Sequence, residues 1–109
     1  MEYPKLALLL DGQWIDRTAA GNLPVFNPAD GTTLGELPVA GAAELQAAAA
    51  AAQRAFPAWA ALLPLERFQV ITRATRLIRE RAPSIARTLT LEQGKPLAEA
   101  TREVSLSAD

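Results

Sequence analysis

Apolar and polar residues alternate near the start of the chain, in the pattern of short β-strands. The apolar stretch 5–10 and the alternating stretch 13–16 flank the dipeptide Asp11-Gly12. Asp-Gly between two such runs predicts a two-residue hairpin turn, because both central residues of a type I′ turn need positive φ. We therefore expect a first β-hairpin here. Trp14 in this hairpin and Trp59 further along the chain are interpreted as core anchors and not as a ligand platform.

A second hairpin is predicted by the residues that follow. The stretches 22–27 and 32–37 flank Pro28-Ala29-Asp30-Gly31, where proline suits the second turn position and glycine the last. Asn27 precedes the proline and is expected to hydrogen-bond its own turn. Residues 1–40 are thus predicted to form two β-hairpins. The expected buried positions of the second hairpin are Leu23, Val25, Leu34 and Leu37.

From residue 41 onward the apolar spacing becomes helical. The first helix contains the alanine run 47–52, and Pro57 is expected to end it or to bend it into a short turn. Pro64 is expected to begin a second helix, Pro83 a short third and Pro96 a last. The prediction is an α+β fold with two hairpins followed by about four α-helices in 41–109. Its apolar faces are Leu45, Ala48, Ala49, Ala52, Phe56 and Trp59, then Phe68, Ile71 and Ile78, then Leu97, Ala100 and Val104.

The composition is that of an ordinary globular protein, either one small domain or part of a larger one. Half of the 109 residues are apolar, 21% are charged and the net charge is −1, which favours neither nucleic acid nor an anionic membrane as a partner. The apolar run Leu6–Leu10 is too short for a signal peptide or a membrane span, so a cytoplasmic protein is expected. The chain has no cysteine and no histidine, which excludes a cysteine nucleophile, a Ser-His-Asp triad and an ordinary zinc site.

No phosphate-binding motif is complete. Gly94-Lys95 resembles the end of a P-loop, but the position that needs the first glycine holds Leu89, and no GxGxxG is present. Gly94 and Pro96 are better explained as a helix stop and a helix start. The cluster Glu92–Pro96 is accordingly interpreted as a helix–helix corner, with a role in folding against an absent part of the protein as the alternative.

Two charged groups are interpreted as solvated helix surface. The arginine-rich stretch Arg67–Arg87 lacks interleaved aromatic residues and contains glutamates, so local ion pairs are favoured over nucleic-acid binding. Glu99 and Glu103 lie one helical turn apart, as in a carboxylate dyad, but Arg102 beside them favours surface charge. Neither group is assigned a catalytic role.

The order of these segments resembles the start of an NAD(P)-dependent aldehyde dehydrogenase. The resemblance rests on "DGQWID", "FNPADGTTLGELP", "AFPAWA" and "LTLEQGKPLAEA" in this order, and the last is most similar to semialdehyde dehydrogenases of the succinate type. The sequence departs from the family at two helix starts, where Ala40-Gly41-Ala42 and Leu62-Leu63 offer no capping side chain. Each lost cap weakens a helix by about 1 kcal/mol.

The resemblance implies that residues 1–109 form an incomplete N-terminal part of the cofactor-binding domain of an α/β enzyme. In the family, a cysteine thiolate attacks the aldehyde, a glutamate activates water and an asparagine stabilises the oxyanion. None of these residues maps onto this chain, so no catalytic, cofactor-binding or metal residue is assigned. The parent is expected to bind NAD or NADP and a small aldehyde, and to be a dimer or tetramer.

The alternative hypothesis is that the chain is a complete protein that does not catalyse a reaction. It would then be a stand-alone helical interaction module or a truncated paralogue that docks on a full-length subunit. The last helical pattern runs into Asp109 without a glycine cap or a basic residue, which favours a fragment. As a fragment, the chain should leave two apolar faces exposed. These are the face of Phe68, Ile71 and Ile78 and the face of Leu97 and Val104.

Overall fold

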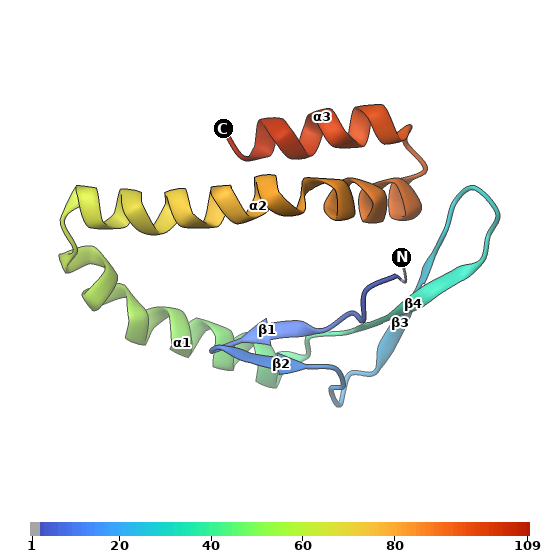
Figure 1. Cartoon of the computed structure of the whole chain (residues 1–109). Coiled ribbons are helices and arrows are strands. Elements are labelled where there is room, and N and C mark those ends of the chain that lie inside the picture. Colours follow the sequence, from blue (N-terminus) through green and yellow to red (C-terminus); the bar gives the residue numbers. More distant parts are fainter. Residues whose placement is uncertain (1–2) are drawn as a thin grey trace. The chain divides into compact units, whose positions relative to one another are not determined.

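The computed structural model describes residues 3–109 as four short strands followed by three helices (Figure 1). The strands are β1 (Leu8–Leu10), β2 (Gln13–Ile15), β3 (Asn22–Phe26) and β4 (Thr33–Pro38). The helices are α1 (Ala42–Ala61), α2 (Pro64–Gln93) and α3 (Leu97–Ser107). The chain divides into two compact units. The first runs up to Val25 and resumes at Thr33–Leu62, and the second comprises Phe26–Thr32 and Leu63–Asp109.

The first hairpin has the predicted turn. Strands β1 and β2 are antiparallel, with Leu9 opposite Trp14. Asp11 has φ 49° and Gly12 has φ 77°, so both central residues have the positive φ that a type I′ turn requires. Within the same unit, α1 contacts β1, and Arg54 of α1 forms an ion pair of 2.8 Å with the turn residue Asp11.

The second hairpin, β3 paired with β4, is closed at its tip by a compact set of hydrogen bonds. The Asn27 amide donates to the Thr32 carbonyl at 2.8 Å, and the Gly31 amide donates to the Asn27 carbonyl at 2.8 Å. The Asn27 side chain accepts from the Ala29 amide at 3.0 Å, which confirms the prediction that it bonds its own turn.

Several predicted core positions of the first unit are exposed. Trp14 is 73% exposed and Trp59 is 39% exposed, so the prediction that the two tryptophans are core anchors is wrong for the described structure. Leu23 and Leu37 are exposed as well, whereas Val25 and Leu34 are half-buried. A two-stranded hairpin has no second layer of its own to cover its apolar face, so alternation alone does not bury a side chain.

The apolar stripe predicted on α1 is also exposed. No residue of α1 is buried, and Phe56 is 66% exposed. The helix nevertheless forms, because its alanines are the strongest helix formers and Glu44 supplies the missing cap. The Glu44 carboxylate accepts a hydrogen bond of 2.8 Å from the Gly41 amide, and Glu66 serves Leu63 at the start of α2 in the same way at 2.8 Å.

The structure has three helices where about four were expected, because α2 continues through Pro83, where a separate helix was expected to begin. Pro57, which was expected to end or bend the first helix, also lies inside α1. A proline inside a helix removes one backbone hydrogen bond and crowds the preceding turn. In α2 this loss is offset by packing on both sides of Pro83. Ile78 and Ala82 before it, and Leu89 after it, pack against the buried cluster of Ala86, Ala100 and Val104. In α1, strong helix formers continue past Pro57 to Ala61.

The buried core of the second unit lies between α2 and α3, where α3 folds back along α2 (Figure 1). Ala86 and Ala100 have no exposed surface, and Val104 is 5% exposed. Two alanines at the contact leave the helices room to approach closely. This cluster confirms the predicted inward face of the last helix at Ala100 and Val104, whereas Leu97 on the same helix is 49% exposed.

Candidate functional site

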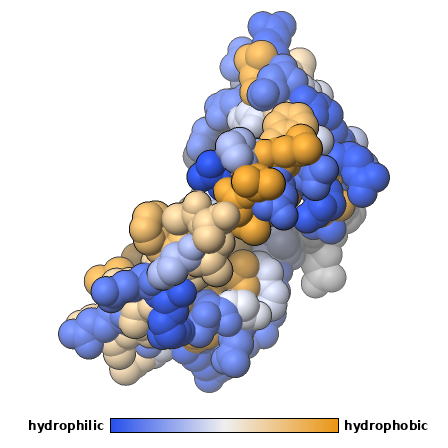
Figure 2. Space-filling model, turned by 90° about the vertical axis from the view of Figure 1, so that its left-hand side faces the viewer, coloured by the Kyte–Doolittle hydropathy of each residue, from blue (hydrophilic) through white to orange (hydrophobic). Residues whose placement is uncertain are grey.

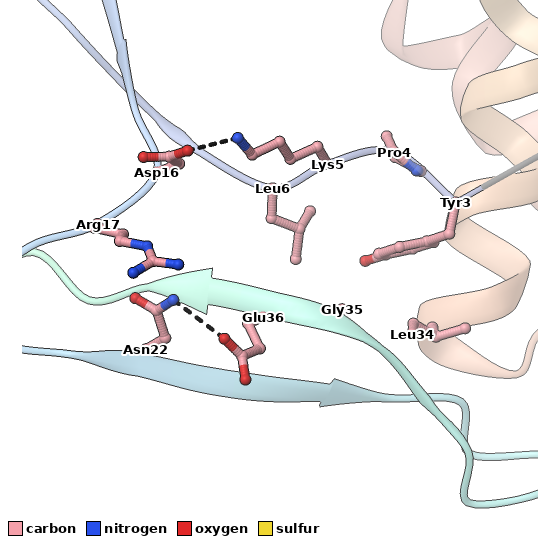
Figure 3. Close-up of a pocket in the computed structure, with 10 residues that line it drawn as sticks. All are labelled: Tyr3, Pro4, Lys5, Leu6, Asp16, Arg17, Asn22, Leu34, Gly35 and Glu36. Atoms are coloured by element: carbon pink, nitrogen blue, oxygen red, sulfur yellow. Dashed lines mark hydrogen bonds and ion pairs between the residues drawn. The ribbon is translucent and has the colours of Figure 1, made fainter.

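A polar cleft of the first unit lies beside β4 (Figure 3). It has a volume of about 670 Å³, within the usual range for small-molecule sites. The backbone of Gly35 forms part of its wall, and a Cβ added there would lie 3.2 Å from Cε1 of Tyr3. The absence of a side chain at Gly35 therefore lets the tyrosine ring approach the strand. The lining residues are Tyr3, Pro4, Lys5, Leu6, Asp16, Arg17, Asn22, Leu34, Gly35 and Glu36.

Four polar side chains of this cleft are already joined in two pairs. Lys5 Nζ lies 2.5 Å from Asp16 Oδ2, and Asn22 Nδ2 donates to Glu36 Oε2 at 3.3 Å (Figure 3). The hydrogen bond from Lys5, together with its positive charge, lowers the pKa of the Asp16 carboxyl below its ordinary value. The cleft presents amide, carboxylate, ammonium and guanidinium groups, which can bind a polar molecule but provide no thiol or imidazole for covalent or acid–base catalysis near neutral pH.

The cluster Glu92–Pro96 forms the corner from α2 to α3, as predicted, with Glu92 as part of the last turn of α2. Gly94 caps α2 with φ 71°, and its amide donates to the Thr90 carbonyl at 2.8 Å. Pro96 is the N-cap of α3 and not its first helical residue, one position from the expectation. Lys95 of this corner forms an ion pair with Glu103 on α3.

The corner also holds the tip of the second hairpin. Pro28 lies against Gly94 so closely that a Cβ added to the glycine would be 3.0 Å from Pro28 Cγ. No pattern in the sequence indicates this contact, because the two residues are far apart in the chain. The Thr90 hydroxyl, one helical turn before Gly94, is buried without a hydrogen-bond partner among the described residues. Gly94 therefore does two things here: it ends α2 and leaves room for the hairpin tip.

The charged groups on the helices are surface ion pairs, as expected. Arg76 pairs with Glu80 at 3.6 Å, and Arg79 pairs with Asp109 at 2.7 Å. Both pairs are largely exposed, so each contributes little to stability. The part of the chain that the structure describes contains no group of three or more residues suited to hold a metal ion. None of its helices is long and apolar enough to cross a membrane.

Large apolar side chains reach the surface of both units (Figure 2 shows one face). Phe68 is 63% exposed and Ile71 is 55% exposed, as expected for a fragment. The same expectation is wrong for Ile78, which is half-buried, and for Val104, which is 5% exposed, because α2 and α3 cover these side chains against each other. Other exposed large apolar residues are Leu9, Leu45, Leu63, Leu65, Leu97 and Leu106.

Both the sequence and the fold of this chain match one known family of proteins. The sequence profile described as "Aldehyde dehydrogenase family" matches residues 14–109, and the chain therefore belongs to the aldehyde dehydrogenase family. A crystal structure of succinate-semialdehyde dehydrogenase from Burkholderia pseudomallei superposes with a TM-score of 0.90 at 37% identity. That match covers 94% of this chain and 21% of the other.

Within the family, the chain is similar to dehydrogenases of semialdehydes. It is 46% identical over 100 residues to the NADP⁺-dependent succinate-semialdehyde dehydrogenase of Escherichia coli (strain K12), covering 92% of this chain and 21% of the relative. It is 43% identical over 99 residues to the glutarate-semialdehyde dehydrogenase of Pseudomonas aeruginosa, covering 91% and 20%. The chain thus spans about a fifth of the length of the curated relatives it matches.

Proposed function

We propose that this chain is the N-terminal part of the cofactor-binding domain of an NAD(P)-dependent dehydrogenase that oxidises a semialdehyde to a carboxylic acid. The observation that carries the proposal is the family match over 14–109, which spans about a fifth of relatives named for succinate and glutarate semialdehydes. Both named substrates carry a carboxylate beside the aldehyde. The substrate class we propose is therefore an aldehyde with an acidic group.

The role of this segment in the parent enzyme is structural. With neither cysteine nor histidine in its sequence, the segment would leave the nucleophile and the general base to other parts of the parent enzyme. The exposed apolar residues Phe56 and Phe68, on α1 and α2, are the kind of surface that packs against further protein. Residues 1–109 are thus proposed to have no catalytic, cofactor-binding or metal-binding residue of their own.

We propose that the described residues do not hold the nicotinamide cofactor. The glycines nearest a helix start, Gly41 and Gly94, stand alone, and no glycine-rich loop precedes a helix to receive a pyrophosphate. Solved structures similar to this chain include complexes with nicotinamide adenine dinucleotide and with NADP. We therefore assign NAD or NADP to the parent enzyme, which we expect in the cytoplasm as a homodimer or homotetramer.

The test begins with the coding sequence that continues past the Asp109 codon. The polypeptide it encodes is expressed and assayed by absorbance for reduction of NAD⁺ and NADP⁺, with succinate semialdehyde, glutarate semialdehyde and an uncharged aldehyde of similar length. We expect oxidation of the two acidic substrates at a higher kcat/KM than the uncharged one. No oxidation of any aldehyde by a correctly folded parent, or a stop codon directly after Asp109, would overturn the proposal.

The isolated 109-residue chain provides the matched control. It should give no reduction of either cofactor, and it should self-associate and bind a hydrophobic dye through its exposed apolar residues. A monomer that unfolds in one sharp two-state transition would instead favour the stand-alone interaction module. Cofactor reduction by this chain alone would contradict its structural role.

A further inference from the structure

Two exposed turns contain the dipeptide Asp-Gly, namely Asp11-Gly12 and Asp30-Gly31. In an Asp-Gly sequence the glycine nitrogen can attack the aspartate side-chain carboxyl, because glycine has no Cβ to shield that nitrogen. The two sites have the same local sequence chemistry. Any difference between their reactivities therefore reports their structural environments.

The second site is shielded by hydrogen bonds on both reacting groups. The Gly31 amide, which would be the nucleophile, donates to the Asn27 carbonyl at 2.8 Å. Asp30 Oδ1 accepts from the Thr32 hydroxyl at 2.7 Å and from the Thr32 amide at 2.9 Å. These bonds from Thr32 lower the pKa of Asp30 below its ordinary value, so the carboxylate stays ionised and is a poor electrophile. Reaction at Asp30 requires this network to open first.

The first site has none of this protection. The Gly12 amide makes no hydrogen bond within residues 3–109, and the only side-chain partner that Asp11 has there is Arg54, at 2.8 Å. Both members of that ion pair are about two-thirds exposed, at 64% for Asp11 and 63% for Arg54, so it restrains the carboxylate weakly. The flanking strands β1 and β2 are three residues each, and a hairpin of that length opens easily.

We infer that Asp11 is a site of spontaneous aspartate isomerisation and that Asp30 is protected from the same reaction. The Gly12 nitrogen attacks Cγ of Asp11, the new N–Cγ bond forms, and one water molecule leaves with a carboxyl oxygen. Water then adds to the resulting five-membered succinimide at the original backbone carbonyl and breaks the old bond to the Gly12 nitrogen. The product is a β-linked isoaspartate of unchanged mass, and no oxidant or co-reactant is consumed.

Isomerisation changes the hairpin at its turn. The β-linkage inserts the Asp11 Cβ into the backbone, so the φ of 49° that matches a type I′ turn is no longer defined by the same atoms. The pairing of Leu10 with Gln13 depends on a two-residue turn and would shift. The free carboxylate moves to the former backbone position, away from Arg54. Slow isomerisation of Asp11 should therefore weaken the pairing of β1 with β2 in the first unit.

The test uses the longest natural polypeptide that contains these residues, aged at neutral pH and physiological temperature. Trypsin cleavage after Lys5, Arg17 and Arg54 places the two sites in separate peptides, 6–17 and 18–54. Electron-transfer fragmentation distinguishes the β-linkage, and methyl transfer by a protein isoaspartyl methyltransferase provides a second readout. We expect isoaspartate at Asp11 to accumulate about tenfold faster than at Asp30, because the shielded turn must break several hydrogen bonds to react.

Ageing in urea provides the first control, since the two rates should converge when both turns are unfolded. The variant Asp11→Glu keeps the charge opposite Arg54 but would need a six-membered ring, so peptide 6–17 should stop accumulating the β-linked product. The matched Asp30→Glu variant should leave the rate at Asp11 unchanged. Native rates that are equal, faster at Asp30 or zero at Asp11, or a tenfold ratio that persists in urea, would overturn the inference.

Discussion

Helix α1 and the helix pair α2–α3 differ in what their apolar residues do. Of the 20 residues of α1, most are apolar, yet none is buried. The longer and more polar α2 buries Ala86, and α3 buries Ala100 and Val104 against it. Apolar content therefore does not decide burial within this chain. Burial follows from having a partner helix, whereas α1 rests on alanine propensity and on one glutamate at its start.

The largest change in the free energy of unfolding is expected at the α2–α3 contact, where it tests whether burial distinguishes the helix pair from α1. Ala86→Leu forces extra volume into a site with no exposed surface, and should reduce the free energy of unfolding by about 1–3 kcal/mol. Ala50→Leu places the same side chain on the exposed surface of α1 and should change stability by less than about 0.5 kcal/mol. Urea unfolding followed by circular dichroism measures both. Equal losses in the two variants would contradict the contrast between α1 and the pair.

Substitution of Gly94, at the corner between α2 and α3, should destabilise the protein more than substitution of Gly31, a turn glycine with a similar positive φ. Gly94 and Gly31 have φ of 71° and 73°, but only Gly94 has a neighbour, Pro28, within 4 Å of an added Cβ. Each Gly→Ala variant should cost about 1 kcal/mol from backbone strain, and Gly94→Ala about 1 kcal/mol more from crowding. Adding Pro28→Ala to Gly94→Ala should recover the extra cost in a double-mutant cycle. A cycle without coupling would place the cost entirely in the backbone.

The helix starts provide a smaller test, because both helices use the same cap. Glu44→Ala and Glu66→Ala should each remove about 0.5–1 kcal/mol, by freeing the amides of Gly41 and Leu63. Helical circular dichroism should fall more for Glu44→Ala, since α1 has no buried contact to hold its first turn. Glu44→Gln keeps an acceptor oxygen and should retain most of the helix. A greater loss of helix in Glu66→Ala would show that burial does not protect α2.

The smallest effect concerns the hairpin tip that belongs to the same unit as α2 and α3. Thr32 lowers the pKa of Asp30, so the ionised carboxylate stabilises the fold above the ordinary carboxyl pKa of about 3.9. That contribution disappears as the pH falls through the lower folded value. Thr32→Val should raise the pKa of Asp30 in a carbon-detected NMR titration, and Thr32→Ser should leave it lowered. An unchanged pKa in Thr32→Val would assign the shift to the backbone bond alone.

The local features of the fold could be predicted from the sequence. Asp11-Gly12 has the geometry of its turn type, Asn27 bonds its own turn, and Gly94 ends α2 as a left-handed cap. Each depends on residues within one turn of each other, where sequence patterns are informative. Pro57 and Pro83 were misjudged, because whether a helix continues through a proline depends on the surrounding packing and propensity.

What the sequence left undetermined depends on residues far apart. Trp14 follows the pattern of a buried strand residue, but its exposure depends on which layers cover the hairpin. The candidate cleft brings Tyr3 and Lys5 together with β4, and no motif announces that arrangement. The family could be identified from the sequence because the resemblance depends on the order of several whole segments and not on single contacts. The profile match over 14–109 confirms this identification.

The contact between Pro28 and Gly94 also has a consequence in time. The two residues are separated by 66 positions (94 − 28 = 66). A ribosome adding about 5–20 residues per second needs about 3–13 s to make the glycine after the proline. Throughout that interval the hairpin tip can rely only on the bonds around Asn27 and Asp30. These local hydrogen bonds can therefore hold the turn 27–32 in its final conformation before Gly94, its later contact, has been synthesised.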